Sequence, residues 1–143
     1  GNAMEALSLL DEMRLEGIKM DSVTIATVLP ICAQIGDIVR GMFIHLYVIK
    51  HGLELHVFVS NALINMYARF GELRHAQKVF DDMMVVRDLV SWNSLIAVYE
   101  QNNVPEKALK YFQEMMINGI RPDLLTLVSV ASGIAQTKSF RCC

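Results

Sequence analysis

Apolar residues recur along the chain at the spacing of helix faces, in segments that glycines and short polar stretches separate. The segments FVSNALINMYARF (58–70) and ELRHAQKVFDDMM (72–84) each place apolar side chains three and four positions apart. This periodicity predicts two helices, with Gly71 between them. Because no segment shows sustained alternation of apolar and polar residues, we expect no β-sheet.

The same pattern occurs more than once. The segment NALINMYARFGELRHAQKVFDDM (61–83) aligns without a gap with NSLIAVYEQNNVPEKALKYFQEM (93–115), and TIATVLPICAQIG (24–36) matches TLVSVASGIAQTK (126–138). The repeats define three whole units of two helices each and a half unit at each end. One helix pair cannot bury both of its faces, whereas stacked pairs can, so the sequence predicts an all-α solenoid. The expected boundaries are 1–21, 22–56, 57–88, 89–123 and 124–143.

Composition excludes several classes of protein. The 143 residues are 53% hydrophobic and 20% charged, which argues against a disordered chain, and the net charge of −2 is not that of a basic nucleic-acid binder. The longest uncharged apolar stretch, 124–135, is too short to cross a bilayer. Three cysteines do not form a disulfide framework, so a reducing compartment is expected. The chain lacks a starting Met, which favours a fragment in which residues 1–3 and Cys142–Cys143 need not be native.

The units resemble pentatricopeptide repeats. LVSWNSLIAVY and EKALKYFQEMMINGIRPD, within 89–123, match that family's long unit along its whole length. The alternation of unit types resembles the plant PLS subclass, with 22–56 similar to its L unit, 57–88 to its S unit and 89–123 to its P unit. Residues 1–21 would then be the second helix of a P-like unit, and 124–143 part of an L-like unit. The ending MMVVRD of the S-like unit is one residue longer than usual.

This resemblance implies a right-handed superhelix that binds single-stranded RNA, one base per unit, each read by two or three side chains. It also implies an organellar factor, in chloroplasts or mitochondria, that serves RNA editing (C-to-U) or RNA processing. In the family, the fifth and last residues of a unit read the base, and these are Asn61 with Asp88 and Asn93 with Asp123. Asn with Asp is the family's combination for uracil, so the resemblance implies 5′-UU-3′ for an RNA whose 5′ end lies toward the N-terminus.

Other family positions have weaker matches. The reading positions of 22–56 hold Ala26 and His56, and Ala26 has no polar group, so this unit is not expected to select a base. Only Arg69 supplies a cation at the position that contacts phosphate in the family. The family's second-place residues, which wedge bases from either side, are here Val23, Phe58, Val90 and Leu125.

The chemistry of the reading residues is reasonable without the family. A carboxamide has donors and an acceptor that complement a pyrimidine edge, but it can flip and so accept cytosine as well as uracil. A carboxylate that accepts from its NH2 group would fix the orientation, which is our hypothesis for Asn61 with Asp88 and Asn93 with Asp123. Two simpler interpretations remain open. The Asp residues are natural helix N-caps, and the Asn residues could lie on a solvated face.

The competing function is a protein-binding scaffold without RNA contact, which the acidic charge and apolar surface favour. The L-like unit could dock organellar editing cofactor proteins even in an RNA binder. We expect no enzyme, because the deaminase signature H-x-E with C-x-x-C is absent, and no metal or other cofactor. The apolar segment 124–135 lacks most of its partner unit, so we also expect end-to-end association between copies.

Overall fold

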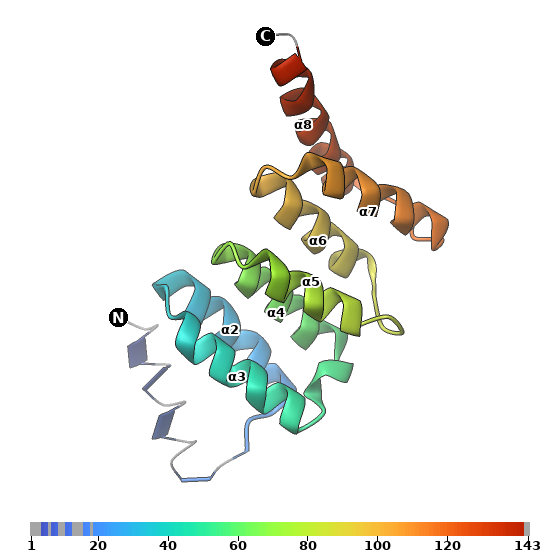
Figure 1. The fold of residues 1–143 in the computed structure, drawn as a ribbon. Helices are drawn as coiled ribbons and strands as arrows, with labels where there is room; N and C mark the ends of the chain where they lie inside the picture. The colour runs from blue at the N-terminus through green and yellow to red at the C-terminus, as the bar shows by residue number, and fades with distance from the viewer. Residues whose placement is uncertain (1–3, 6, 9–10, 13–15, 18, 142–143) are drawn as a thin grey trace.

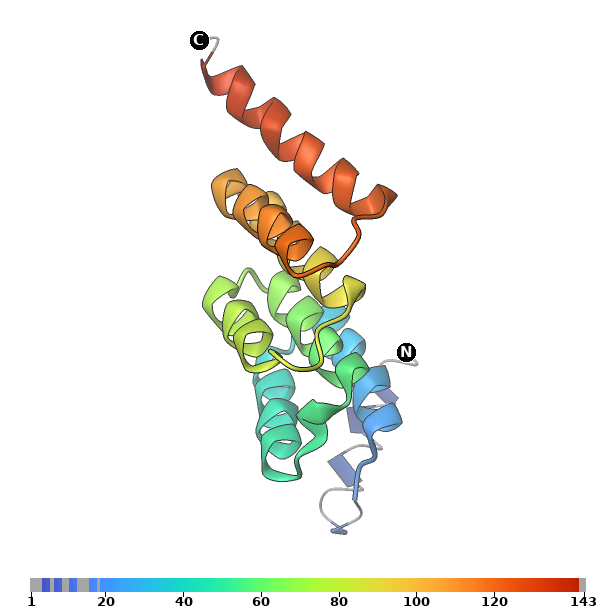
Figure 2. The same cartoon turned by 90° about the vertical axis from the view of Figure 1, so that its right-hand side faces the viewer.

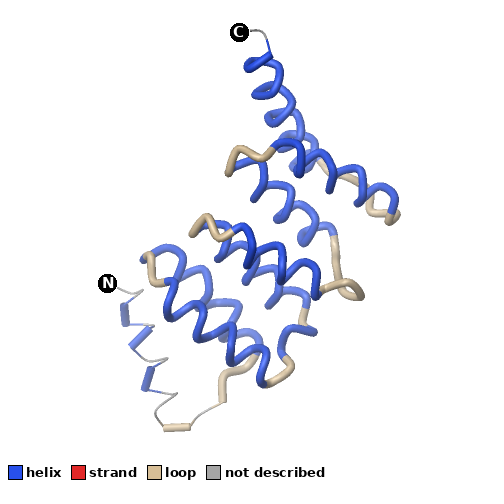
Figure 3. The backbone as a smooth tube through the Cα atoms, viewed as in Figure 1, coloured by secondary structure: helices blue, strands red, loops and turns tan. Residues whose placement is uncertain are grey.

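All regular structure in the described part of the chain is helical (Figure 3). The computed structural model of the protein describes residues 4–5, 7–8, 11–12, 16–17 and 19–141. Residues 1–3 and Cys142–Cys143, whose native status the sequence left open, lie outside the described residues. The helices are α2 (Ser22–Ile35), α3 (Ile38–Lys50), the short 3-10 helix η1 (Leu53–Leu55), α4 (Val57–Arg69), α5 (Leu73–Asp82), α6 (Leu89–Gln101), α7 (Pro105–Ile117) and α8 (Leu124–Arg141).

The helices stack as successive antiparallel pairs (Figure 1). The first helices α2, α4, α6 and α8 contact one another in order and form one layer. Each of α3, α5 and α7 packs against the first helix of its own pair, and α5 and α7 also contact the first helix that follows. Figure 2 shows that the stack is elongated, with α8 at its upper end. The predicted all-α solenoid is therefore confirmed.

Equivalent positions of successive pairs form the core. Leu29, Ile64 and Ile96 occupy the same place in α2, α4 and α6, and none of these side chains is exposed. Ala76 of α5 and Ala108 of α7 are also buried at equivalent positions. Gly41 holds the corresponding place in α3, where an added Cβ atom would lie 2.3 Å from Met66 Sδ. The sequence repeat therefore corresponds to a repeated packing arrangement in the core.

Glycines lie at the corners that follow α3 and α7. Gly52 and Gly119 have φ angles of 67° and 78°, in the left-handed region that favours glycine after a helix. In the second case the chain then runs through Pro122 to Asp123, where α8 begins.

The last described helix has a large apolar surface. Leu124, with 77% of its surface exposed, and Leu125, with 62%, lie on α8 together with the exposed side chains of Leu127, Val128 and Ile134. The expected end-to-end association through this surface stays a prediction. No described helix combines the length and the hydrophobicity that a bilayer span requires.

Candidate functional site

A groove of about 630 Å³ lies between the first helices α2, α4 and α6. Its wall contains Asn61 from α4 and Asp88, which precedes α6. Arg69 and Asp88 are the charged residues of the lining. The groove is therefore mostly neutral, with apolar side chains beside three amides, one carboxylate and one guanidinium. These apolar side chains include Phe58 and Val90.

Asn61 is held at both ends of its amide group. Its Nδ2 atom donates a hydrogen bond to Asp88 Oδ1 at 3.1 Å, and its Oδ1 atom accepts one from the Ser91 hydroxyl at 2.6 Å. A carboxylate only accepts hydrogen bonds, so the amide nitrogen must face Asp88. The side chain of Asn61 is only 7% exposed. The orientation of its amide is thus fixed by two partners.

Asn93 repeats this arrangement one unit later. Its Nδ2 atom donates to Asp123 Oδ1 at 3.1 Å, and its Oδ1 atom accepts a hydrogen bond from the Thr126 hydroxyl. Asn93 is 8% exposed, close to the value for Asn61. Two consecutive units therefore build the same network, although Asn93 and Asp123 lie outside the lining of the groove described above.

The two carboxylates also cap helices, so the simpler interpretation is right as well. Asp88 Oδ1 accepts from the Ser91 backbone N–H at 3.0 Å at the start of α6, and Asp123 Oδ1 accepts from the Thr126 N–H at 3.0 Å at the start of α8. In return, the Ser91 hydroxyl accepts from the Asp88 N–H at 3.2 Å, which completes a capping box. Capping thus places each carboxylate where it can also hold an amide.

These contacts keep both carboxylates ionised. Burial favours a higher pKa for Asp88, but hydrogen bonds from the Ser91 N–H and from Asn61 outweigh it, and the pKa is lowered. The pKa of Asp123 is also lowered, mainly by the hydrogen bond from the Thr126 backbone N–H, with a smaller contribution from Asn93. Each site therefore presents a negative carboxylate at neutral pH.

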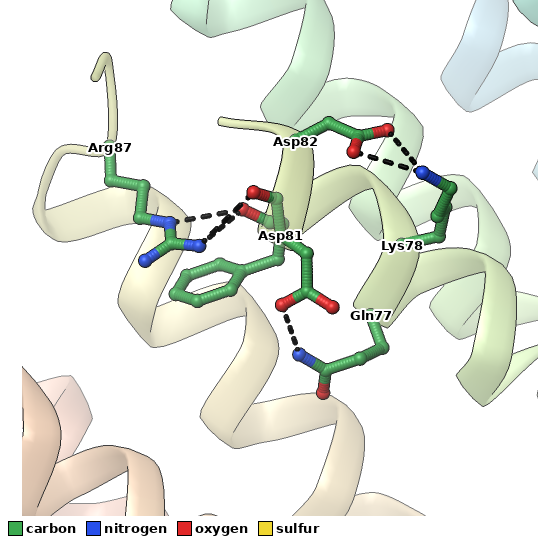
Figure 4. A network of polar contacts seen from close by, with 6 residues as sticks. Gln77, Lys78, Asp81, Asp82 and Arg87 are labelled. Atoms are coloured by element: carbon green, nitrogen blue, oxygen red, sulfur yellow. Dashed lines mark hydrogen bonds and ion pairs between the residues drawn. The ribbon is translucent and has the colours of Figure 1, made fainter. Parts of the chain in front are cut away.

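Arg87, whose hydrogen bonds Figure 4 shows, anchors the loop that precedes Asp88. Its Nε and Nη2 atoms donate to the Phe80 carbonyl at the end of α5, at 3.0 and 2.8 Å. Its guanidinium carbon also lies 3.9 Å from the centroid of the Phe80 ring and 5.5 Å from that of Trp92. A cation at a helix C-terminus is favourable because the last carbonyls lack partners. Arg87 occupies, in residues 57–88, the position that Gly119 occupies in residues 89–123.

The remaining predicted residues are exposed or line the groove. Val23, Phe58, Val90 and Leu125, predicted to stack bases, are 65%, 44%, 51% and 62% exposed. Arg69 is exposed on the groove, and Ala26 lines it from α2. His56 precedes α4 but makes no side-chain hydrogen bond that caps it. In the described part of the chain, no three His, Cys, Asp or Glu side chains are placed to hold a metal ion.

Sequence reasoning missed Ser91, Thr126 and Arg87. A signal for the first two was present, because the spacing Asp-x-x-Ser/Thr occurs at Asp21, Asp88 and Asp123. That spacing predicts a cap at each helix start, and Asp21 Oδ1 does accept from the Thr24 N–H at 2.7 Å. It does not show that the hydroxyl also reaches an Asn about one unit earlier.

Comparisons with known proteins agree with this geometry. A family model described as PPR repeat family matches residues 87–136, and one described as PPR repeat matches 1–18 and 58–86. Together they take in more than half of the chain. The pentatricopeptide repeat-containing protein At4g33990 of Arabidopsis thaliana is 53% identical over all 143 residues. Protein At1g11290 of the same plant, whose name includes "chloroplastic", is 39% identical over 94% of the chain.

The fold has solved counterparts. The crystal structure of the pentatricopeptide repeat protein PPR10 from maize matches 94% of this chain, with a TM-score of 0.80 at 22% identity. The chain corresponds to 20% of that maize chain and spans 17% of the length of each of the two Arabidopsis relatives. The matching family models, the Arabidopsis relatives and the shared solenoid agree, and the chain belongs to the pentatricopeptide repeat family.

Proposed function

We propose that this chain binds single-stranded RNA along its first helices and reads uridine at two consecutive units. The observation that carries the proposal is the duplicated network, in which Asn61 with Asp88 and Asn93 with Asp123 adopt the same hydrogen-bonded arrangement. A merely solvated polar face would not place both amides at 7% and 8% exposure against ionised carboxylates.

The hydrogen-bonding groups that each network leaves unused are complementary to uracil. After the bonds to Asp88 and Ser91, the Asn61 amide keeps one N–H donor and one oxygen lone pair. Asp88 Oδ2 accepts no hydrogen bond from the described residues. A donor beside an acceptor complements the O4 and N3–H groups of uracil. Because the amide is fixed from both ends, it does not rotate to present the reverse order to cytosine.

Exposed apolar side chains suit the faces of the bases. Phe58 on α4 and Val90 on α6, two successive first helices, line the same groove as Asn61. A base at Asn61 would therefore lie between Phe58 and Val90, and the next base between Val90 and Leu125. Arg69 is the cation of the groove lining and is available to a phosphate.

The unit before these two is proposed to bind without selecting a base. We assign 22–56 as an L-like, 57–88 as an S-like and 89–123 as a P-like unit, with 1–21 and 124–143 as parts of further units. Ala26 lines the groove where the next two units have Asn, and it offers no hydrogen bond to a base edge. The proposed target is therefore an unselected base followed by 5′-UU-3′.

Relatives support a role in organellar RNA metabolism. PPR10 has been crystallised in complex with an 18-nt psaJ RNA element, and that structure matches this chain with a TM-score of 0.78. The names of At1g11290 and of the relative CRR2, which is 42% identical, include "chloroplastic". We propose that the chain is part of the recognition tract of an organellar factor for RNA editing or processing.

The test is a titration of short RNAs with the chain at low salt. Low salt is chosen because salt screens the attraction between protein cations and phosphates, and this groove has few cations. Wild type is expected to prefer an RNA with UU over one with AA by roughly tenfold or more, because mismatched polar edges cost about 1–3 kcal/mol each. The double variant Asn61→Ala/Asn93→Ala should lose this preference, while Asn118→Ala, outside the groove, should keep it. Equal affinity of wild type for UU and AA would reject the proposal.

A specific observation favours a second function on the opposite helix layer. Helix α3 exposes an apolar stripe with Val39 at 76%, Leu46 at 65% and Ile49 at 55%, next to Met42. The exposed residues of α5, by contrast, are polar or charged. A continuous exposed apolar face is typical of a protein contact. We propose that the L-like unit docks a partner protein, such as an organellar editing cofactor, through this stripe.

Leu46→Glu tests this second function. The substitution places a charge at the centre of the stripe, and its effect on folding should be small because Leu46 is mostly exposed. It should weaken capture of an editing cofactor protein by roughly tenfold or more, as loss of a central contact typically does, and leave RNA affinity unchanged. Lys78→Glu on α5 is the matched control. Unchanged capture by the Leu46→Glu variant would exclude the stripe as the contact.

A further inference from the structure

The hydroxyls of Ser91 and Thr126 lie at the amide oxygens of Asn61 and Asn93, which belong to the preceding unit. We infer that these hydroxyls are positioning residues for base reading, so that each reading element spans a unit boundary. This inference rests on the proposed function and adds to it a third residue, contributed by the neighbouring unit.

The hydroxyl has one proton, and its contacts show where that proton goes. Ser91 Oγ lies 2.6 Å from Asn61 Oδ1 and 3.0 Å from Asp88 Oδ1, while the Asp88 N–H donates to it at 3.2 Å. The shorter distance favours donation to the Asn61 oxygen. Asp88 is already satisfied there, because its Oδ1 accepts from the Ser91 N–H and from Asn61 Nδ2. The amide oxygen therefore depends on the hydroxyl.

Two hydrogen bonds are needed to fix the orientation of the Asn amide. A hydrogen bond from Nδ2 to the carboxylate sets which end of the amide faces Asp, but it leaves the amide plane free to turn about that contact. A second bond at Oδ1 fixes the plane, and so the direction of the remaining N–H and lone pair. Because Asn61 and Asn93 are more than nine-tenths buried, removing the hydroxyl would also leave a buried carbonyl oxygen without its donor.

One unit boundary of the chain lacks this network. In the boundary between 22–56 and 57–88, the three positions hold Ala26, His56 and Val59. Val59 is fully buried and has no hydroxyl, and Ala26 has no amide for one to hold. The three members of the network are thus present together in two units and absent together in the third. His56 makes no side-chain cap either, so the amide, the cap and the hydroxyl are lost together at this boundary.

Thr126→Val tests the inference, because it removes the hydroxyl and keeps the side-chain volume and the backbone cap. In the full chain, the preference for uridine over cytidine at the second base should fall by roughly threefold or more, as for loss of one hydrogen bond. Preference at the first base, read by Asn61, should not change and is the internal control. Thr126→Ser should restore the wild-type preference, since Ser91 serves the equivalent role.

A second readout does not involve RNA. The side-chain NH2 signals of Asn93 in NMR spectra should exchange faster with solvent in Thr126→Val than in wild type, and recover in Thr126→Ser. Unchanged signals, or a loss of affinity that is equal for uridine and cytidine, would overturn the inference. If wild type itself shows no base preference, the proposed function fails, and a change in the Asn93 signals would still establish that the hydroxyl holds the amide.

Discussion

Phe80→Ala is expected to lower the free energy of unfolding by about 3–5 kcal/mol, the typical cost of truncating a buried aromatic residue. Phe80 is 1% exposed and lies where three helices meet. Its ring packs edge-on against Trp92 of α6 and Tyr111 of α7, with distances of 4.9 and 5.9 Å between ring centroids. The Arg87 guanidinium lies over the same ring. The truncation therefore leaves a cavity and removes a cation–π contact. Urea unfolding followed by circular dichroism measures the loss.

Phe58→Ala is the matched control, because it makes the same chemical change at a side chain that is 44% exposed. Its effect on the free energy of unfolding should stay within about 1 kcal/mol, as for most surface positions. It should weaken RNA binding instead, since Phe58 is proposed to stack a base. Equal destabilisation by the two substitutions would contradict the packing described for the joint between α5, α6 and α7.

Asn93→Thr is expected to change the base preferred by the second reading unit. The substitution replaces an amide, held by Asp123 and Thr126, with one hydroxyl that cannot present a donor and an acceptor side by side. With Asp123 retained, the family code predicts guanine in place of uracil. The preference should shift by roughly tenfold or more, because lost or misplaced hydrogen bonds cost about 1–3 kcal/mol. Competition binding with RNAs that differ only at this base measures it.

The measurement is best made with the substitution in a longer array of repeats, because this groove has few charges to hold phosphate. Preference at the first base, read by Asn61 and Asp88, should stay as in wild type. If Asn93→Thr weakens every RNA equally, Asn93 supports packing or a phosphate contact, and its proposed role in base reading is wrong.

Much of the fold could be predicted because it is local and repeated. Helical spacing and the aligned segments predicted the helix pairs. Asp88 and Asp123 were predicted both as caps and as partners of an amide, and the structure brings both pairs together. These inferences needed only residues whose positions within a unit are fixed.

The contacts that the sequence did not predict are those that cross unit boundaries or lie in irregular segments. Ser91 and Asn61 are 30 residues apart, and only the angle between α4 and α6 decides whether they touch. Arg87 lies in the irregular ending of residues 57–88, where no periodic pattern indicates which carbonyls it reaches. The extra residue in that ending was visible in the sequence, but its anchoring by a guanidinium on Phe80 was not.

A structure of the chain bound to an RNA that contains UU tests the central claim most directly. The account predicts that the Watson–Crick edges of the two uracils lie within hydrogen-bonding distance of Asn61 with Asp88 and of Asn93 with Asp123. The rings should lie between the exposed side chains of Phe58 and Val90 and of Val90 and Leu125. RNA bound on the outer helices, or bases that turn away from both amides, would contradict it.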